Sequence, residues 1–135
     1  MLLEAAQPLS HEATARLNDL ALLCRPLPLD WVGAEPLTSG AELSASPQAS
    51  PYLAIAALVS AVGAPHSATA EQAPSSYSEA ADQFDAAAWT REWFGEMFVH
   101  DTLELARREA TMRSDAAADL GELSDWDIQR YGEVG

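Results

Sequence analysis

Four residues of types that can bind metals or transfer protons recur at four-residue spacing in the second half of the chain. They are Glu92, Glu96, His100 and Glu104. On a helix, this spacing places them in one slowly winding stripe. Carboxylate-bridged metal sites in helical bundles take Glu-x-x-His motifs from two helices and further glutamates from two others. The spacing here is four and the motif has no second copy, so we interpret the stripe as a solvated helix face.

The dipeptide His100-Asp101 is a second candidate for metal chemistry. The same pair occurs in metal-dependent phosphohydrolases, which take several more ligands from other helices. Neither His11 nor His66 stands in a matching context, so the pair is not expected to form such a site.

The chain lacks residues on which other catalytic mechanisms depend. It contains no lysine, which excludes a P-loop, a Schiff-base lysine and a protein-kinase site. It contains no Gly-x-Ser-x-Gly elbow for a serine nucleophile. The single cysteine, Cys24, excludes an internal disulfide, and its leucine-rich surroundings predict a buried structural thiol. We therefore expect no metal, no cofactor and no enzymatic activity.

The charge balance restricts the classes of partner. The net charge is −14, with 21 acidic residues against seven arginines. This charge disfavours binding to nucleic acid and to anionic membrane surfaces, and it favours a partner with a basic surface. No apolar run approaches the ~20 residues of a membrane span, and the first residues do not form a signal peptide. We expect a cytoplasmic protein.

Two tryptophans and a methionine, Trp89, Trp93 and Met97, follow one another at four-residue spacing. On a helix they lie opposite a second apolar stripe, which is the expected core side and contains Phe84, Phe94, Phe98 and Leu105. Glu96 and His100 lie at the edge of the tryptophan face. An exposed apolar patch of this size is typical of a partner-binding site. The alternative is that this face packs inside the protein.

The last segment, 114–135, mixes six acids with apolar and aromatic residues that include Trp126 and Tyr131. Such a segment can be a binding peptide that orders on a basic, apolar groove of a partner. The alternative is a terminus that docks on the protein itself.

Three segments are predicted to be helical: 10–24, 51–62 and 79–113. Ser10 is a suitable N-cap for the first, and Pro51 is suited to the first position of the second. The third is either one long helix or two abutting helices, and Gly95 favours a kink within it.

The segment 51–62 is apolar on every side, and a helix without a polar face is expected to be buried. We therefore predict that it is the central core helix. Its large side chains are predicted to be almost fully buried; these are Leu53, Ile55, Leu58 and Val59.

The remaining segments complete the predicted fold. Prolines and glycines in 25–49 favour an extended segment packed across the helices, with a short hairpin as the alternative. The segment 64–77 has the composition of a mobile linker. We predict an all-α fold: a bundle of three to four helices around the apolar helix, without a sheet of three or more strands. The bundle would be a single domain over 1–113, followed by the partly flexible acidic tail 114–135.

These observations favour a non-enzymatic protein-binding module: an adaptor, a specialised chaperone or an assembly factor. Its predicted contacts are the Trp89, Trp93 and Met97 face and the acidic tail. Its predicted partner is another protein, for which the charge favours a basic surface, or a second copy. One alternative is an acidic inhibitor that mimics nucleic acid. Another is a small helical enzyme that uses the glutamate and histidine stripe.

Overall fold

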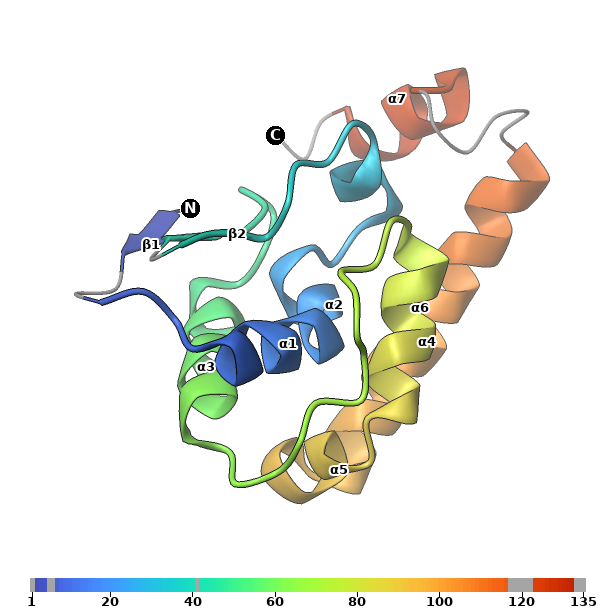
Figure 1. Ribbon diagram of the computed structural model, residues 1–135. Helices are drawn as coiled ribbons and strands as arrows, with labels where there is room; N and C mark the ends of the chain where they lie inside the picture. The colour runs from blue at the N-terminus through green and yellow to red at the C-terminus, as the bar shows by residue number, and fades with distance from the viewer. Residues whose placement is uncertain (1, 5–6, 41, 117–122, 133–135) are drawn as a thin grey trace.

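The computed structural model describes residues 2–4, 7–40, 42–116 and 123–132, and these are mostly helical, as the sequence predicts (Figure 1). The α-helices are α1 (His11–Asp19), α2 (Ala21–Cys24), α3 (Pro51–Gly63), α4 (Tyr77–Ala86), α5 (Trp89–Phe94), α6 (Glu96–Ala116) and α7 (Asp125–Tyr131). A 3-10 turn, η1 (Pro28–Trp31), and three strands complete the described elements; the strands are β1 (Leu2–Glu4), β2 (Thr38–Ser39) and β3 (Glu42–Ser44).

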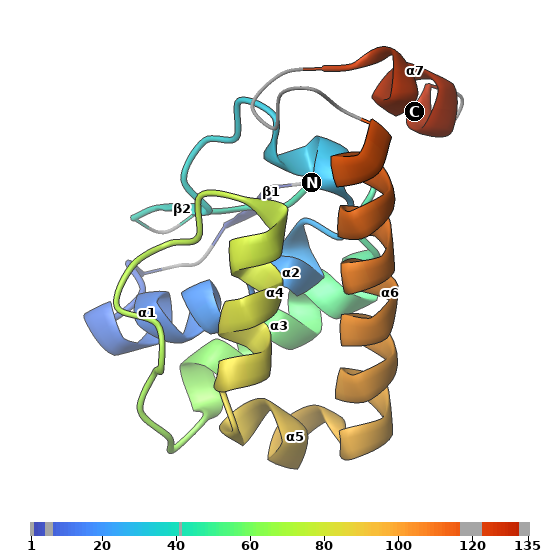
Figure 2. The ribbon, with the colours of Figure 1, turned by 90° about the vertical axis from the view of Figure 1, so that its right-hand side faces the viewer.

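The helices form layers around α1 and α2, which lie between α3 on one side and α4 on the other (Figures 1 and 2). The core contains fully buried side chains from each layer, among them Leu17, Leu20, Phe84 and Val99. No helix in the described part of the chain is long and apolar enough to cross a lipid bilayer.

The segment predicted as one long helix, 79–113, is broken twice. Ala87 leaves helical geometry after α4, and Gly95 adopts a φ of +86° between α5 and α6. The predicted kink at Gly95 is therefore confirmed, because this backbone conformation strongly favours glycine. The two breaks allow the chain to reverse, so that α4 and α6 run side by side in opposite directions with α5 at the turn (Figure 2).

The first predicted helix, 10–24, is also divided, because Leu20 leaves helical geometry between α1 and α2. Its predicted start is confirmed: the Ser10 hydroxyl accepts a hydrogen bond from the Ala13 amide at 3.1 Å. Cys24 is fully buried, as predicted, and burial raises the pKa of its thiol to about 12. This cysteine therefore remains a protonated, inert core residue at neutral pH.

A small antiparallel sheet with strand order β1-β3-β2 lies beside the helices (Figure 1). The hairpin β2–β3 confirms the alternative reading of the segment 25–49. The prediction that no sheet of three or more strands forms is wrong, because β1 pairs with β3, with Leu2 opposite Ser44. A strand of three residues is too short to give a periodic signal in the sequence.

The segment between α3 and α4 has no helix or strand but is tied to the core through Asp19. This aspartate is fully buried at the end of α1. Its carboxylate accepts hydrogen bonds from the Thr69 amide at 2.9 Å, the Ala70 amide at 2.7 Å and the Trp89 indole at 2.9 Å. One side chain thus joins α1, α5 and a loop that the sequence suggested was a mobile linker.

Candidate protein-binding surface

Helix α3 buries its small side chains and exposes its large ones. The side chains turned inward are Ala54, Ala57, Ser60 and Ala61, each at most 4% exposed. The large side chains turned outward are Tyr52, Ile55, Val59 and Val62, which are 82%, 46%, 59% and 57% exposed. We call these last four residues the α3 face. The helix contains no charged residue.

This arrangement contradicts the prediction that α3 is a buried central helix. Ile55 and Val59 are exposed, and Leu53 and Leu58 are only half-buried. The physical reason lies in the packing against α1 and α2. Alanine and serine let two helix backbones approach closely, whereas the larger side chains would hold them apart. A helix that is apolar all round carries no polar side to indicate which face points outward.

The predicted tryptophan face is divided by the structure. Trp89 is 5% exposed and its indole donates to Asp19, so the expectation that it lies on an exposed face is wrong. Trp93 is 41% exposed and Met97 is 78% exposed. A Cβ atom at Gly63 would lie 3.8 Å from Cη2 of Trp93, which places this indole beside the last residue of α3. Trp93 therefore extends the α3 face onto α5.

An apolar hollow of about 150 Å³ lies between α3 and α6. It is lined by Leu22, Leu23, Pro26, Ser50, Leu53, Tyr77, Thr102, Leu105 and Ala106. A second hollow of about 360 Å³ shares Pro26 and Leu105 with it and reaches Arg130 and Tyr131 of α7. Leu105, predicted to face the core, is 61% exposed at this junction. The apolar surface thus continues from α3 towards α6.

The glutamate and histidine stripe does not converge on a single site. Glu92 pairs with His66 at 2.6 Å, and Glu96 pairs with Arg91 at 3.3 Å. His100 Nδ1 lies 3.3 Å from Asp101 Oδ1 and 4.0 Å from Glu104 Oε2. In the described ranges, His100, Asp101 and Glu104 have ligand atoms within 4.8 Å of one another, but all three are exposed and belong to α6.

We expect no metal at this cluster after purification without chelator, because three exposed ligands from one helix do not enclose an ion. Elemental analysis should find zinc, iron and manganese each far below one ion per chain. A stoichiometric metal that is lost in the variant His100→Ala would contradict this expectation. It would also restore the stripe as a candidate enzyme site.

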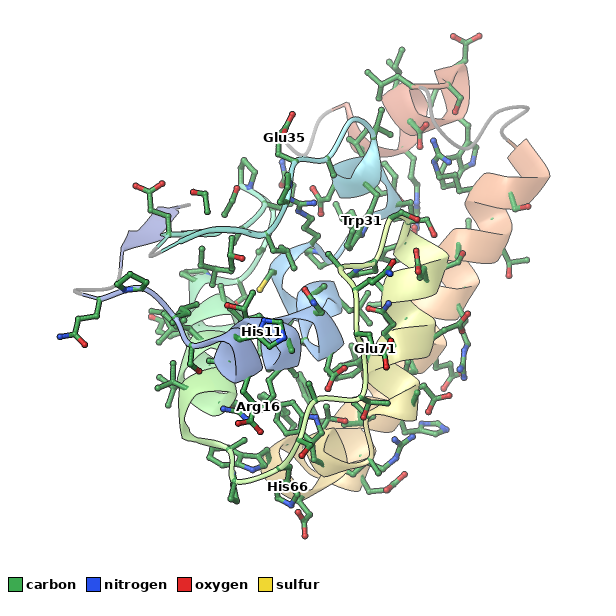
Figure 3. All side chains as sticks on the ribbon, in the orientation of Figure 1. His11, Arg16, Trp31, Glu35, His66 and Glu71 are labelled. Atoms are coloured by element: carbon green, nitrogen blue, oxygen red, sulfur yellow. The ribbon has the colours of Figure 1, made fainter. Side chains whose placement is uncertain are left out.

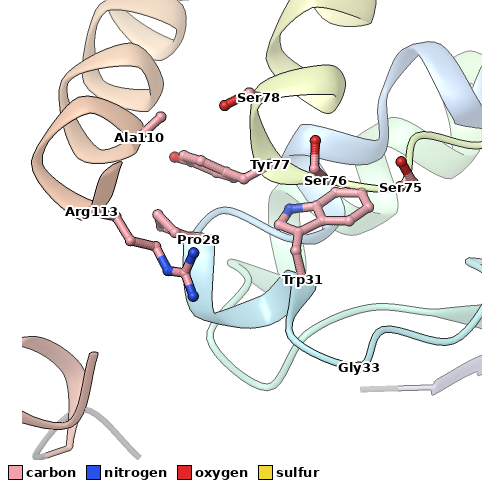
Figure 4. A pocket seen from close by; sticks show the side chains of 9 residues that line it. All are labelled: Pro28, Trp31, Gly33, Ser75, Ser76, Tyr77, Ser78, Ala110 and Arg113. Carbon is pink, nitrogen blue, oxygen red and sulfur yellow. The ribbon is translucent and has the colours of Figure 1, made fainter. Parts of the chain in front are cut away.

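A hollow of about 200 Å³ lies between η1, the start of α4 and α6 (Figure 4). It is lined by Pro28, Trp31, Gly33, Ser75, Ser76, Tyr77, Ser78, Ala110 and Arg113. Several of its polar groups are already engaged: Ser76 caps α4, Tyr77 donates to the Pro26 carbonyl and Arg113 binds Asp127. None of these lining residues is a histidine or a carboxylate that could activate a serine.

The described part of the acidic tail, 123–132, docks on α6. Arg113 donates from Nε to Asp127 Oδ1 at 2.9 Å, and both side chains are buried. Arg130 binds Glu109 at 2.7 Å, and the Tyr131 hydroxyl also donates to Glu109. The docked alternative is therefore the one that the structure supports for these residues.

The two tail aromatics occupy different positions. Tyr131 is buried and accounts for part of the contact between α7 and α6. Trp126 is half-buried and meets the Tyr131 ring edge to face, with 5.7 Å between the ring centroids. Of the two predicted contact residues in the tail, Tyr131 is therefore internal, and Trp126 keeps part of its surface exposed.

Two carboxylates on this interface have lowered pKa values. Burial raises the pKa of Asp127, but the hydrogen bonds from Arg113 and Ser124 outweigh it. Burial likewise raises the pKa of Glu109, and the bonds from Arg130 and Tyr131 outweigh it. Both carboxyl groups therefore titrate below their ordinary values in the docked state.

We expect α7 to detach from α6 in acid. A carboxyl group whose pKa is lower in the docked state stabilises docking above its ordinary value of about 4, and this stabilisation is lost as pH falls through the lowered pKa. The indole N–H resonance of Trp126, followed by NMR, should move to its free position below about pH 4. The variant Asp127→Asn should show the free position already at neutral pH. A resonance that stays unchanged down to pH 2 would contradict this account.

The α3 face is the feature that sequence reasoning missed. The informative signal is side-chain size and not polarity: small residues recur at 54, 57 and 61, and large ones at 52, 55, 59 and 62. Of the predicted contact residues, Trp93 lies beside α3, Met97, Glu96 and His100 are exposed, and Trp89 and Tyr131 are internal. Comparison of the chain with protein-family models, curated proteins and solved structures finds no match.

Proposed function

We propose that this chain is a non-enzymatic protein-binding module, an adaptor or assembly factor, that binds another protein through the α3 face and Trp93. One observation carries the proposal: a charge-free helix presents four large apolar side chains to solvent while Ala54, Ala57 and Ala61 face the core. Contiguous exposed apolar surface of this kind is uncommon on monomeric proteins and usually marks a site of interaction.

Within the described residues, the four side chains of the α3 face remain exposed to solvent. Single exposed apolar residues are ordinary on protein surfaces. Here the four side chains share one face of a single helix, at intervals of three, four and three residues, and Trp93 adjoins its end. Burial of one large apolar side chain stabilises a complex by roughly 1.5–3 kcal/mol, so the face is sufficient to anchor a partner.

The charge of the chain favours a protein over a lipid surface or a second copy. Helices that lie on membranes combine an apolar face with lysine and arginine, and α3 contains neither. Two copies would each bring a net charge of −14 to the contact. A mimic of nucleic acid would use a continuous acidic surface, and the α3 face contains no charged side chain.

Site-specific photo-crosslinking in the cells that naturally make this protein tests the proposal. The crosslinking amino acid is placed at Tyr52 on the α3 face, or at Asp82, an exposed position on α4. Helix α4 lies across α1 and α2 from α3 (Figure 1). We expect one protein to crosslink at position 52 and not at 82, and the purified pair to reassemble. The product should disappear when Val59→Ser is added. Equal products at both positions, or a product insensitive to Val59→Ser, would contradict the proposal.

A further inference from the structure

We infer that the partner presents an amphipathic α-helix with basic residues, and that its basic end lies over the C-terminal end of α3. This inference rests on the proposed function and specifies the chemistry of the partner. It combines the spacing of the α3 face with the charges that surround one end of it.

The spacing of the exposed side chains indicates a helical partner. Tyr52, Ile55, Val59 and Val62 follow one another at intervals of three, four and three residues. These are the intervals of the contact seam when two helices pack with side chains of one between those of the other. With 13 residues, α3 is about 20 Å long, so it offers a contact of nearly four turns.

Acidic groups stand on both sides of the C-terminal end of α3. On the α1 side, Arg16 donates to the Ala61 carbonyl at 2.6 Å and to the His66 carbonyl at 3.0 Å (Figure 3). Glu12 pairs with this buried arginine at 3.2 Å, and its side chain remains 62% exposed. On the α5 side, Glu92 contacts His66 at 2.6 Å and remains 69% exposed. Both carboxylates are therefore within reach of a partner that covers Val62.

The carbonyl groups at a helix C-terminus carry a partial negative charge of roughly half an elementary charge. At this end of α3 the Arg16 guanidinium offsets that charge through the Ala61 carbonyl, so the negative charge offered to a partner is that of the exposed carboxylates Glu12 and Glu92. At the other end, the first turn of α3 contains no acidic residue. A helix lying on the α3 face is consequently attracted most strongly where its basic residues approach Glu12 and Glu92. Arginine or lysine at that end fixes the direction in which the partner lies.

A second copy of this chain does not match these requirements. Its own α3 contains no basic residue to place beside Glu12 and Glu92, and the copies repel each other through their net charge of −14. The occupant that complements both the apolar seam and the acidic end is a heterologous helix with arginine or lysine.

Three designed peptides of about five turns, roughly 18 residues, test the inference. The first carries leucine at heptad a and d positions and lysine on the flanks of one end. The second has the same leucines with glutamate in place of lysine, and the third has the composition of the first in a scrambled, non-amphipathic order. We expect only the first to bind, by fluorescence anisotropy, and Val59→Asp to weaken it more than about tenfold. Equal binding of the first and third, or of the first and second, would overturn the inference.

A matched pair of charge reversals tests the position of the basic end. Glu92→Arg and Glu104→Arg change the net charge equally, and both glutamate side chains are exposed. Glu104 serves as the control because it lies on α6, in the hollow beside Asp85 and Arg107. We expect Glu92→Arg to weaken binding of the first peptide about threefold to tenfold and to reduce the salt dependence of that binding. The affinity of Glu104→Arg for the same peptide should stay close to that of the native protein. Equal effects of the two changes would overturn the inference.

Further controls separate this inference from the proposed function. If position 52 crosslinks a protein but no basic helix binds, the inference is wrong and the binding function stands. If sedimentation shows a dimer that Val59→Asp dissociates, the occupant is a second copy, and the inference is wrong. Binding to vesicles of phosphatidylcholine and phosphatidylserine that requires Val59 would overturn both proposals.

Discussion

Replacing Asp19 with alanine is expected to lower the free energy of unfolding by about 3–5 kcal/mol, because two buried donors and one partly buried donor would lose their acceptor. They are the amides of Thr69 and Ala70 and the indole of Trp89. Each buried donor left without a partner costs roughly 1–3 kcal/mol, against a total stability of about 5–15 kcal/mol for a domain. Urea unfolding followed by circular dichroism measures the loss.

Two variants serve as controls for Asp19→Ala. Asp19→Asn keeps one oxygen that can accept from Thr69 and Trp89, so its loss should be smaller than that of the alanine variant. Asp82→Ala, at an exposed position on α4, should change stability by less than about 0.5 kcal/mol. Equal stability of Asp19→Ala and Asp82→Ala would mean that the loop and α5 are not anchored through Asp19.

Enlarging a small residue on the inner side of α3 should be more harmful than truncating a large one on its outer side. Ala57 is fully buried against α1 and α2, and Val59 is 59% exposed. Ala57→Leu inserts volume into a close helix contact and is expected to cost about 1–3 kcal/mol or more. Val59→Ala should cost less than about 0.5 kcal/mol, since little of the side chain is buried.

Comparing the stability losses of Ala57→Leu and Val59→Ala distinguishes a helix with an exposed outer side from a helix buried on every side. In a buried helix, Val59→Ala would leave a cavity and cost markedly more than about 1 kcal/mol. Thermal and urea unfolding of both variants beside the native protein give the comparison. A larger loss for Val59→Ala than for Ala57→Leu would show that α3 is rotated relative to the orientation described here.

Local signals in the sequence predicted the parts of the fold that depend on a few neighbouring residues. The Ser10 cap, the start of α3 at Pro51 and the break at Gly95 are of this kind. Each follows from the backbone chemistry of one residue: a side-chain acceptor for free amides, a proline without an N–H, or a glycine at positive φ. Such features do not require knowledge of distant contacts.

The parts that sequence reasoning missed depend on contacts between distant segments. Trp89 is internal because it reaches Asp19, 70 residues earlier in the chain. The orientation of α3 depends on how closely α1 and α2 approach it, and its uniformly apolar sequence offers no polar face as a guide. Tyr131 is buried because Glu109 lies beside it on α6, 22 residues away.

Contacts between distant segments also decide which residues of the candidate site are exposed. Periodicity correctly grouped Trp93 and Met97 as exposed, but it also placed Trp89 with them, because a single long helix would share that face. The break at Gly95 changes how Met97 on α6 lies relative to Trp93. Trp89 and Trp93 share α5, and they differ in burial because the Trp89 indole reaches Asp19. Hydrophobicity alone does not indicate the α3 face, because side-chain size and not polarity distinguishes the exposed side of this helix from its buried side.

The most direct test of the central claim is a calorimetric titration of the crosslinked partner, once purified, into the native protein and into the variant Ile55→Ser/Val59→Ser. Both side chains lie on the exposed α3 face, so the variant should unfold within about 1 kcal/mol of the native protein. We predict that the affinity of this variant for the partner falls more than about tenfold while its stability is retained. Unchanged affinity, or a large loss of stability, would contradict the claim that α3 presents its large side chains to another protein.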